Sequence, residues 1–282
     1  MSEELRAGLG LGRLPFIALG VLLALFLLVP MLVVVPTSWT SGQLLEFPPV
    51  GFSTQWYERV FEDPTWTDPF KTSLNIAFKA SLLATVMGTA AALGMRRLTA
   101  NRSARFMRSA FILPLAIPYV SYALGIYNLF DKVAFGALDT TTPLILAQSV
   151  IAFPLVYVVV AGALSGVDPR LGRAAATLGA RWPTIVWKIE LPLIRMAIVG
   201  GWLFAFATCF DEAVLAIFLA PVTDVTLAQQ LYRSAAESIE PTLSAVSTVI
   251  TLAAILVLGL ASLLVRRAGA GPQSRPSREA IT

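Results

Sequence analysis

Long runs of apolar residues constrain this chain more than any other feature. Residues 14–35 contain no charged side chain, and further apolar runs of similar length follow along the chain. A helix needs about 20 such residues to cross the hydrocarbon layer of a bilayer. We therefore predict an all-α integral membrane protein with six transmembrane helices. The predicted spans are Leu14–Val35, Thr72–Met95, Ser109–Phe130, Pro143–Val167, Met196–Pro221 and Pro241–Val265.

The overall composition agrees with a membrane environment. Hydrophobic residues make up 56% of the 282 residues and charged residues 13%, and the mean hydropathy is +0.74. Soluble domains carry about a quarter charged residues, so this chain has too little polar surface to cover a water-facing globule. The first apolar run is too long for the core of a signal peptide, and we expect it to remain as a span.

The positive charges predict the orientation. With both termini in the cytoplasm, sixteen of the 21 Lys and Arg residues lie inside and four lie outside, while Lys79 falls within a span. Cytoplasmic loops of membrane proteins are enriched in these residues, so we predict cytoplasmic termini. The net charge of +4 is then explained by the orientation of the chain in the membrane. We therefore expect membrane lipid, and no nucleic acid, as a partner.

These boundaries divide the chain into three parts. Residues 1–13 form a cytoplasmic N-terminus, residues 14–267 form the transmembrane domain, and residues 268–282 form a tail rich in Gly, Pro, Ser and Arg that we predict to be disordered.

The outer segment Pro36–Phe70 is acidic and aromatic. Ser53 is placed to cap a short helix with Trp56 and Val60 on one face. The segment is interpreted either as an interfacial aromatic anchor or as a docking surface for an external partner.

Several kinds of chemistry are excluded by residues that the sequence lacks. There is no histidine, and Cys209 is the single cysteine. An internal disulfide, a multi-thiolate or histidine metal site and a Ser-His-Asp triad are therefore ruled out. The sequence also has no Gly-rich phosphate loop ending in Gly-Lys-Ser/Thr. We expect no catalytic residue, no metal site and no nucleotide site in this chain.

The cytoplasmic loop 168–192 between the fourth and fifth spans predicts a short exposed helix. Asp168 is a good N-cap, and Pro169 occupies the first helical position, where its missing N–H costs nothing. Gly179 suits the left-handed residue that ends a helix. Pro183 then begins a second short helix, which leads into the fifth span.

The same loop resembles the signature of binding-protein-dependent ABC importer permeases. That signature is a Glu-Ala-Ala triplet, a Gly four residues after its last Ala, then nine residues, Ile, any residue and Leu-Pro. The matching residues are Ala174, Ala175, Gly179, Ile189, Leu191 and Pro192. The triplet's glutamate is Arg173 here, a reversal of charge.

The resemblance extends over most of the chain and is nearest to the second permease subunit of the spermidine/putrescine branch, to which Phe210-Asp211-Glu212 and the 245–248 stretch are also similar. It implies a multi-pass subunit of the bacterial inner membrane that pairs with a second homologous permease subunit. It also implies that the loop helix docks into a cytoplasmic ATPase, two of which bind ATP and Mg, and that an external solute-binding protein delivers the cargo.

Two acids interrupt the predicted fifth span. A charge at the bilayer centre costs about 2.5–3.5 kcal/mol on insertion scales, so such acids usually face protein or water. Asp211 and Glu212 are interpreted either as pathway residues for a cationic solute, with Trp202, Phe206 and Phe210 beside them, or as structural acids. A structural acid would pair with Lys79 or bond to the partner permease.

We predict a non-enzymatic permease subunit of an ATP-driven importer, forming half of a pathway for polyamines or a related small organic cation. The same class of importer for another solute, such as iron or an amino-acid-like compound, is the first alternative. A self-sufficient secondary transporter would need inverted repeats and an internal ion site, and neither is evident in the sequence. A membrane-embedded enzyme would need a reactive constellation at one depth, which Cys209 beside Asp211 does not provide.

Overall fold

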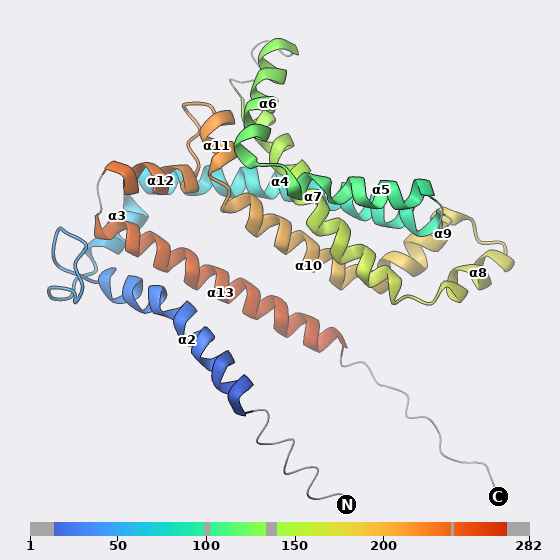
Figure 1. Ribbon diagram of the computed structural model, residues 1–282, viewed down its shortest axis with the longest axis horizontal. Helices are drawn as coiled ribbons and strands as arrows, with labels where there is room; N and C mark the ends of the chain where they lie inside the picture. Colours follow the sequence, from blue (N-terminus) through green and yellow to red (C-terminus); the bar gives the residue numbers. More distant parts are fainter. Residues whose placement is uncertain (1–13, 99–101, 134–139, 238–239, 270–282) are drawn as a thin grey trace, which may run out of the picture. The chain divides into compact units, whose positions relative to one another are not determined.

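The described residues of the computed structural model are helical and contain no strand. They are 14–98, 102–133, 140–237 and 240–269 (Figure 1). The elements, in chain order, are α2 (Leu14–Thr37), α3 (Gln55–Glu62), α4 (Pro64–Arg97), α5 (Arg102–Ile112), η1 (Leu113–Ala116), α6 (Tyr119–Val133), α7 (Thr142–Ser165), α8 (Pro169–Thr177), α9 (Trp182–Ile185), η3 (Val186–Glu190), α10 (Leu191–Phe210), α11 (Val214–Leu219), α12 (Leu227–Glu237) and α13 (Pro241–Gly269).

Four of the described helices are long and apolar enough to cross a membrane. They are Pro15–Thr37, Pro64–Arg97, Thr142–Ser165 and Trp182–Phe210, and each has 23 residues or more. The bent pair made of α5–η1 and α6 passes the same test if it counts as one span. At ~1.5 Å per residue these lengths match a hydrocarbon layer of roughly 30 Å. The prediction of an all-helical membrane protein is confirmed, with four or five apolar spans among the described residues.

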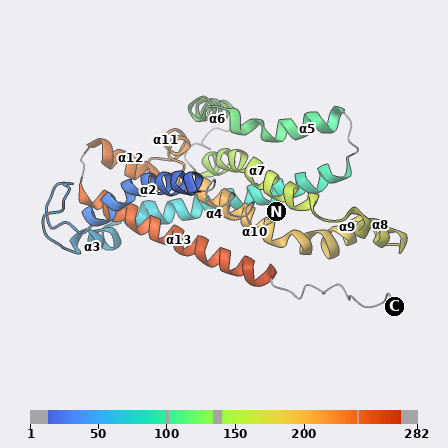
Figure 2. The same cartoon turned by 60° about the horizontal axis from the view of Figure 1, so that its bottom comes forward.

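The third predicted span, Ser109–Phe130, is not one straight helix. Its two halves meet at 98°, and Figure 2 shows α5 and α6 on either side of the break. Pro114 lies inside the 3₁₀ turn η1, and Pro118 lies just before α6. Proline removes a backbone donor and restricts the residue before it, so the α-helix cannot continue through this segment.

The helix at the fifth predicted span, Met196–Pro221, begins and ends at other residues than predicted. The helix begins earlier, because α9, η3 and α10 are continuous from Trp182, and it ends at Phe210. A separate short helix, α11, follows. Asp211 and Glu212 therefore lie after a helix end instead of inside a span. The sixth predicted span, Pro241–Val265, falls within α13, of which Pro241–Val257 is a shorter apolar helix that does not count among the four or five spans. The helix of α13 also includes Ala268 and Gly269 of the predicted tail; the rest of that tail and residues 1–13 lie outside the described residues.

The chain divides into two compact units, one formed by residues 1–63 and 234–256 and the other by residues 64–233 and 257–282. In the first unit, α3 buries Trp56 and Val60, which the sequence places on one face; its N-cap residue is Thr54 and not the predicted Ser53. The Trp56 indole N–H donates to the Thr40 carbonyl at 2.7 Å, so this side chain packs inside the unit. Arg59 pairs with Glu240 at 3.2 Å.

The second unit is built on α4, α7 and α10, which pack side by side (Figure 1). Alanines of α4 form a fully buried stripe: Ala77, Ala80 and Ala84. Val156 of α7 lies between two glycines; a Cβ on Gly88 of α4 would come within 2.8 Å of its Cβ, and one on Gly201 of α10 within 3.3 Å of its Cγ1. Small residues bring helix backbones together where lipid offers no hydrophobic drive for association.

Candidate functional site

The helix predicted in the cytoplasmic loop is present as α8. The Asp168 carboxylate accepts a hydrogen bond from the Arg170 backbone N–H at 2.8 Å, and Pro169 is the first helical residue. The N-cap and the proline thus have the roles that the sequence predicts, and the start of the helix is well defined.

Gly179 ends α8 in the left-handed conformation, with φ of +87°. The Gly179 N–H donates to the Ala176 carbonyl, and the Ala180 N–H donates to the Ala175 carbonyl, both at 3.0 Å. This pair of bonds is a Schellman cap, which needs a residue that tolerates positive φ. The positive φ at this position therefore explains why this chain has a glycine there.

The outer surface of α8 is open. No residue of the helix is buried; Arg173 and Ala174 are exposed, Ala175 is half-buried, and Leu178 after the helix is 89% exposed. The packing contacts of α8 are to the α9 and η3 segment. The helix therefore presents small residues and the exposed Leu178 on an open surface.

The segment after α8 joins it to the membrane core without a break. Ile185 is buried and Ile189 is half-buried, one turn apart as the sequence predicts. Residues 186–190 form a π-helical turn, in which the Leu191 N–H donates to the Val186 carbonyl. Leu191 and Pro192 begin α10. Pro192 has no N–H to offer the carbonyl four residues earlier, and a wider turn accommodates that missing bond.

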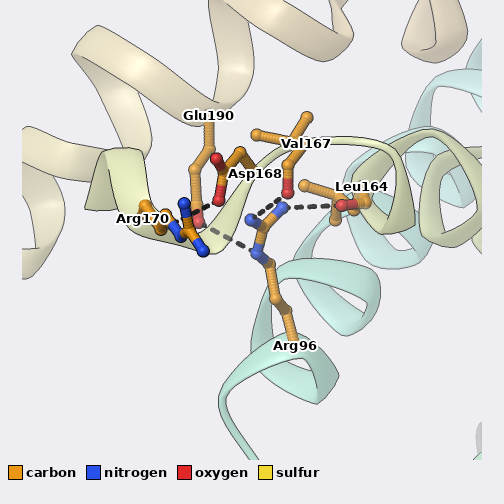
Figure 3. A network of polar contacts seen from close by, with 6 residues as sticks. All are labelled: Arg96, Leu164, Val167, Asp168, Arg170 and Glu190. Atoms are coloured by element: carbon orange, nitrogen blue, oxygen red, sulfur yellow. Dashed lines mark hydrogen bonds and ion pairs between the residues drawn. The ribbon is translucent and has the colours of Figure 1, made fainter. Parts of the chain in front are cut away.

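Arg96, near the end of α4, joins the two ends of this loop (Figure 3). Its guanidinium donates to the Leu164 carbonyl at 2.8 Å and to the Val167 carbonyl at 2.9 Å. Its Nε lies 3.4 Å from a carboxylate oxygen of Glu190, and the two side chains are 19% and 14% exposed. The planar fork of arginine donors allows all three contacts at once, which a lysine could not reproduce.

A second arginine of α4 holds the same segment. The Arg97 guanidinium lies over the Trp182 ring, 4.5 Å from its centroid, at the first residue of α9. Sequence reasoning assigned no role to these residues. One available signal was that Glu190 and the capping Asp168 are the two acids of the loop, so Glu190 stands out among basic neighbours.

The two acids after α10 have different surroundings. Glu212 is 8% exposed, and its carboxylate accepts from the Val214 N–H at 3.0 Å and the Leu215 N–H at 2.7 Å. It therefore caps the start of α11, where free N–H groups attract a negative charge. Asp211 is exposed at the end of α10. Within the described residues it forms no ion pair with Lys79.

The predicted aromatic residues form a ladder along α10. Trp202, Phe206 and Phe210 follow one another at centroid distances of 5.9 Å and 6.0 Å. Phe78 of α4 meets Trp202 edge-on, and Phe70 meets Phe210 edge-on. The ladder is thus partly a packing device between α4 and α10.

An open groove of about 590 Å³ runs beside this ladder. Trp202 and Phe206 line it from α10, and α4 contributes Lys71, Asn75 and Lys79 among others. The structure therefore brings two of the predicted pathway aromatics to an accessible surface, together with two lysines. Glu212 is not in this groove, and the loop signature lies at the opposite end of α10.

The chain matches one protein family over residues 84–269, the binding-protein-dependent transport system inner membrane components. The chain belongs to this family. As a member, this permease is an importer subunit and not an enzyme, and ATP hydrolysis belongs to a separate subunit.

Characterised relatives cover most of the permease. The putrescine transport system permease protein PotI of Escherichia coli K12 is 31% identical over 247 residues, which are 86% of this chain and 88% of PotI. The spermidine/putrescine transport system permease protein PotC of Haemophilus influenzae is 29% identical over 243 residues, 86% of this chain and 93% of PotC.

Solved structures show the same fold. A chain of a bacterial ABC transporter that imports the acidic polysaccharide alginate superposes with a TM-score of 0.70, covering 93% of the permease and 99% of that chain at 14% identity. A chain of the MetNI methionine ABC transporter in an inward-facing form gives 0.56, covering 70% and 92% at 18% identity. The helical fold of the permease is thus that of ABC importer permeases.

Proposed function

We propose that this permease forms half of the translocation pathway of an ATP-driven polyamine importer in a bacterial inner membrane. It would have six spans and cytoplasmic termini, and would pair with a second homologous permease subunit. Two cytoplasmic ATPases would bind ATP and Mg, and an external binding protein would deliver the solute. The observation that carries the proposal is α8, a capped helix in which no residue is buried.

The charge of α8 specifies the kind of surface that it meets. Arg170, Arg173 and Arg181 are exposed, whereas the nearby acids are engaged: Asp168 caps the helix and Glu190 pairs with Arg96. A cleft that receives this helix therefore needs acidic groups to complement it. The ATPase partner of this permease would carry carboxylates opposite Arg173.

Polyamine cargo is supported by the putrescine transport of PotI, the spermidine/putrescine transport of PotC and by Asp211. Its carboxylate is exposed directly after the aromatic ladder of α10. A carboxylate next to aromatic faces attracts organic ammonium groups through charge and cation–π interactions.

The groove favours a second candidate, a solute that is not cationic. Lys71 and Lys79 line the groove beside Trp202 and Phe206, and Lys71 is paired with Asp68 at 2.9 Å. The Lys79 ammonium would repel a polyamine that entered the groove. An amino-acid-like compound, with its carboxylate, suits such a lining better.

The first experiment is a mild-detergent purification of the tagged permease from its native membrane, followed by identification of the co-purifying chains. Recovery of an ATPase and a second permease is the expected result. Recovery of the chain alone, under conditions that preserve other membrane complexes, would contradict the proposed importer assembly and favour a self-sufficient transporter.

Uptake of labelled spermidine by two neutralising variants then separates the two kinds of cargo. If the cargo is a polyamine, Asp211→Asn should slow uptake and Lys79→Gln should not. The opposite pattern, or wild-type uptake with Asp211→Asn, would contradict a role for Asp211 in a cation pathway.

A further inference from the structure

The loop that carries α8 is closed at its base by one side chain. The Leu164 and Val167 carbonyls lie at the start of the loop and Glu190 lies at its end, and the Arg96 guanidinium contacts all three (Figure 3). Residues 168–189 therefore form a hairpin whose two ends are held together from a third element, α4.

The Arg96 contacts lie where the loop joins the helices on either side of it. Leu164 belongs to the last turn of α7, and Val167 is next to the residue that caps α8. Glu190 is the last residue of the π turn that continues into α10. Carbonyls at a helix C-terminus carry negative partial charge, so the guanidinium is attracted to all of its partners. Low exposure limits screening by water and salt.

Arg97 makes a separate contact with the segment 182–190, which follows α8. Its stacking on Trp182 holds the first residue of α9 against the end of α4, while Arg96 holds the far end of the π turn. Arg97 and Arg96 of α4 thus contact the first and last residues of the segment 182–190. The same segment packs against α8.

From this geometry we infer that Arg96, supported by Arg97, is a positioning residue that transmits displacement of α8 to α4. The inference rests on the proposed function, in which an ATPase moves α8. A push on α8 reaches α10 through the backbone, and it reaches α4 through Arg96 and Arg97. Because α4 and α10 line the groove, both walls then move together. Because Arg97 and the packing of α4 against α10 remain, loss of Arg96 should weaken the movement of α4 and not abolish it.

The test uses the complete assembly with its partner permease and ATPases, reconstituted in lipid nanodiscs. A cysteine replaces Asn75, which lines the groove on α4, in a Cys209→Ala background. The measured quantity is the change in its rate of labelling by a polar maleimide when ATP and vanadate are added. This readout requires no knowledge of the cargo. The amount of bound ATPase and its basal hydrolysis are measured in parallel.

Arg96→Gln should reduce the nucleotide-driven change by about tenfold, within the roughly 5–150-fold range of coupling between sites, with bound ATPase and basal hydrolysis unchanged. Glu190→Gln, which keeps the carbonyl contacts of Arg96, should show a smaller loss, and the double variant should resemble Arg96→Gln alone. Arg96→Lys should recover part of the response. Arg105→Gln is the matched control, because Arg105 is exposed on α5, and it should respond as the parent does.

Two results overturn the inference. One is a parental nucleotide response in Arg96→Gln. The other is a loss in Glu190→Gln that adds fully to that of Arg96→Gln, since residues acting through one contact are not additive. Failure of the proposed function looks different: the parent assembly itself would lack a bound ATPase, or its labelling would not respond to nucleotide at all.

Discussion

For individual residues, position relative to a helix end decides what a charged side chain does. Asp211 and Glu212 are neighbours in sequence, yet Asp211 is exposed where α10 ends and Glu212 is buried where α11 begins. Charge and spacing made both residues candidates for the pathway. The hydrogen bonds of Glu212 to two backbone N–H groups instead assign it to the structure of α11.

Glu212→Gln should therefore lower stability. The amide keeps one acceptor and places an NH₂ group against the second backbone N–H, so one capping bond is lost, at a cost of about 1–2 kcal/mol. The thermal midpoint of the detergent-solubilised chain measures the effect. Asp211→Asn is the matched change and should leave the midpoint unaltered. Equal midpoints for Glu212→Gln and the parent would show that the cap contributes nothing.

Gly179→Asp should impair docking of the ATPase while membrane insertion stays normal. No atom lies within 4 Å of a Cβ at this position, so no clash arises within the chain. Asp and Asn both enter the left-handed region, here at a φ of +87°, more readily than other L-residues. The expected loss therefore comes from the carboxylate, which opposes the negative end of the α8 dipole. Co-purified ATPase per unit of membrane-inserted chain is the measurement. Gly179→Asn, uncharged and tolerant of positive φ, should retain most docking; wild-type docking by the Asp variant would contradict this account.

Among the elements, close packing of α4 against α7 depends on Gly88. A Cβ there would lie 2.8 Å from the Val156 Cβ and 3.0 Å from the Tyr157 nitrogen, so α4 or α7 must shift. Gly88→Ala should cost about 1–3 kcal/mol of stability as an overpacked contact. Gly94→Ala on the same helix meets open space and should be neutral or mildly stabilising. Equal thermal midpoints for the two variants would be inconsistent with this packing.

Elements defined by local signals were predictable from the sequence, and those defined by distant contacts were not. Asp168, Pro169 and Gly179 marked both ends of α8 because capping is a property of neighbouring residues. Pro114 and Pro118 stop the α-helix locally, but no local signal sets the angle of 98° between the two halves. The Arg96 contacts join residues about 70 to 90 positions apart in the chain, and no local pattern announces them.

For the whole molecule, orientation decides whether α8 can reach an ATPase at all. The imbalance of sixteen positive residues against four predicts that α8 faces the cytoplasm and that the segment between α11 and α12 faces outward. The continuous helix Trp182–Phe210 and the short helix α11 separate these two segments. A single-cysteine test on each side of α10 can therefore establish the orientation.

Leu178→Cys and Thr223→Cys suit this test because both positions are exposed and Cys209 is buried. In intact spheroplasts a membrane-impermeant maleimide should label position 223 and spare position 178; after permeabilisation it should label both. The control is the parent chain with Cys209 alone, which should stay unlabelled. The reversed pattern would place α8 outside the membrane, where no cytoplasmic ATPase can bind it, and the coupling role of Arg96 would fall with that placement. Labelling as predicted leaves α8 on the side where ATP is available.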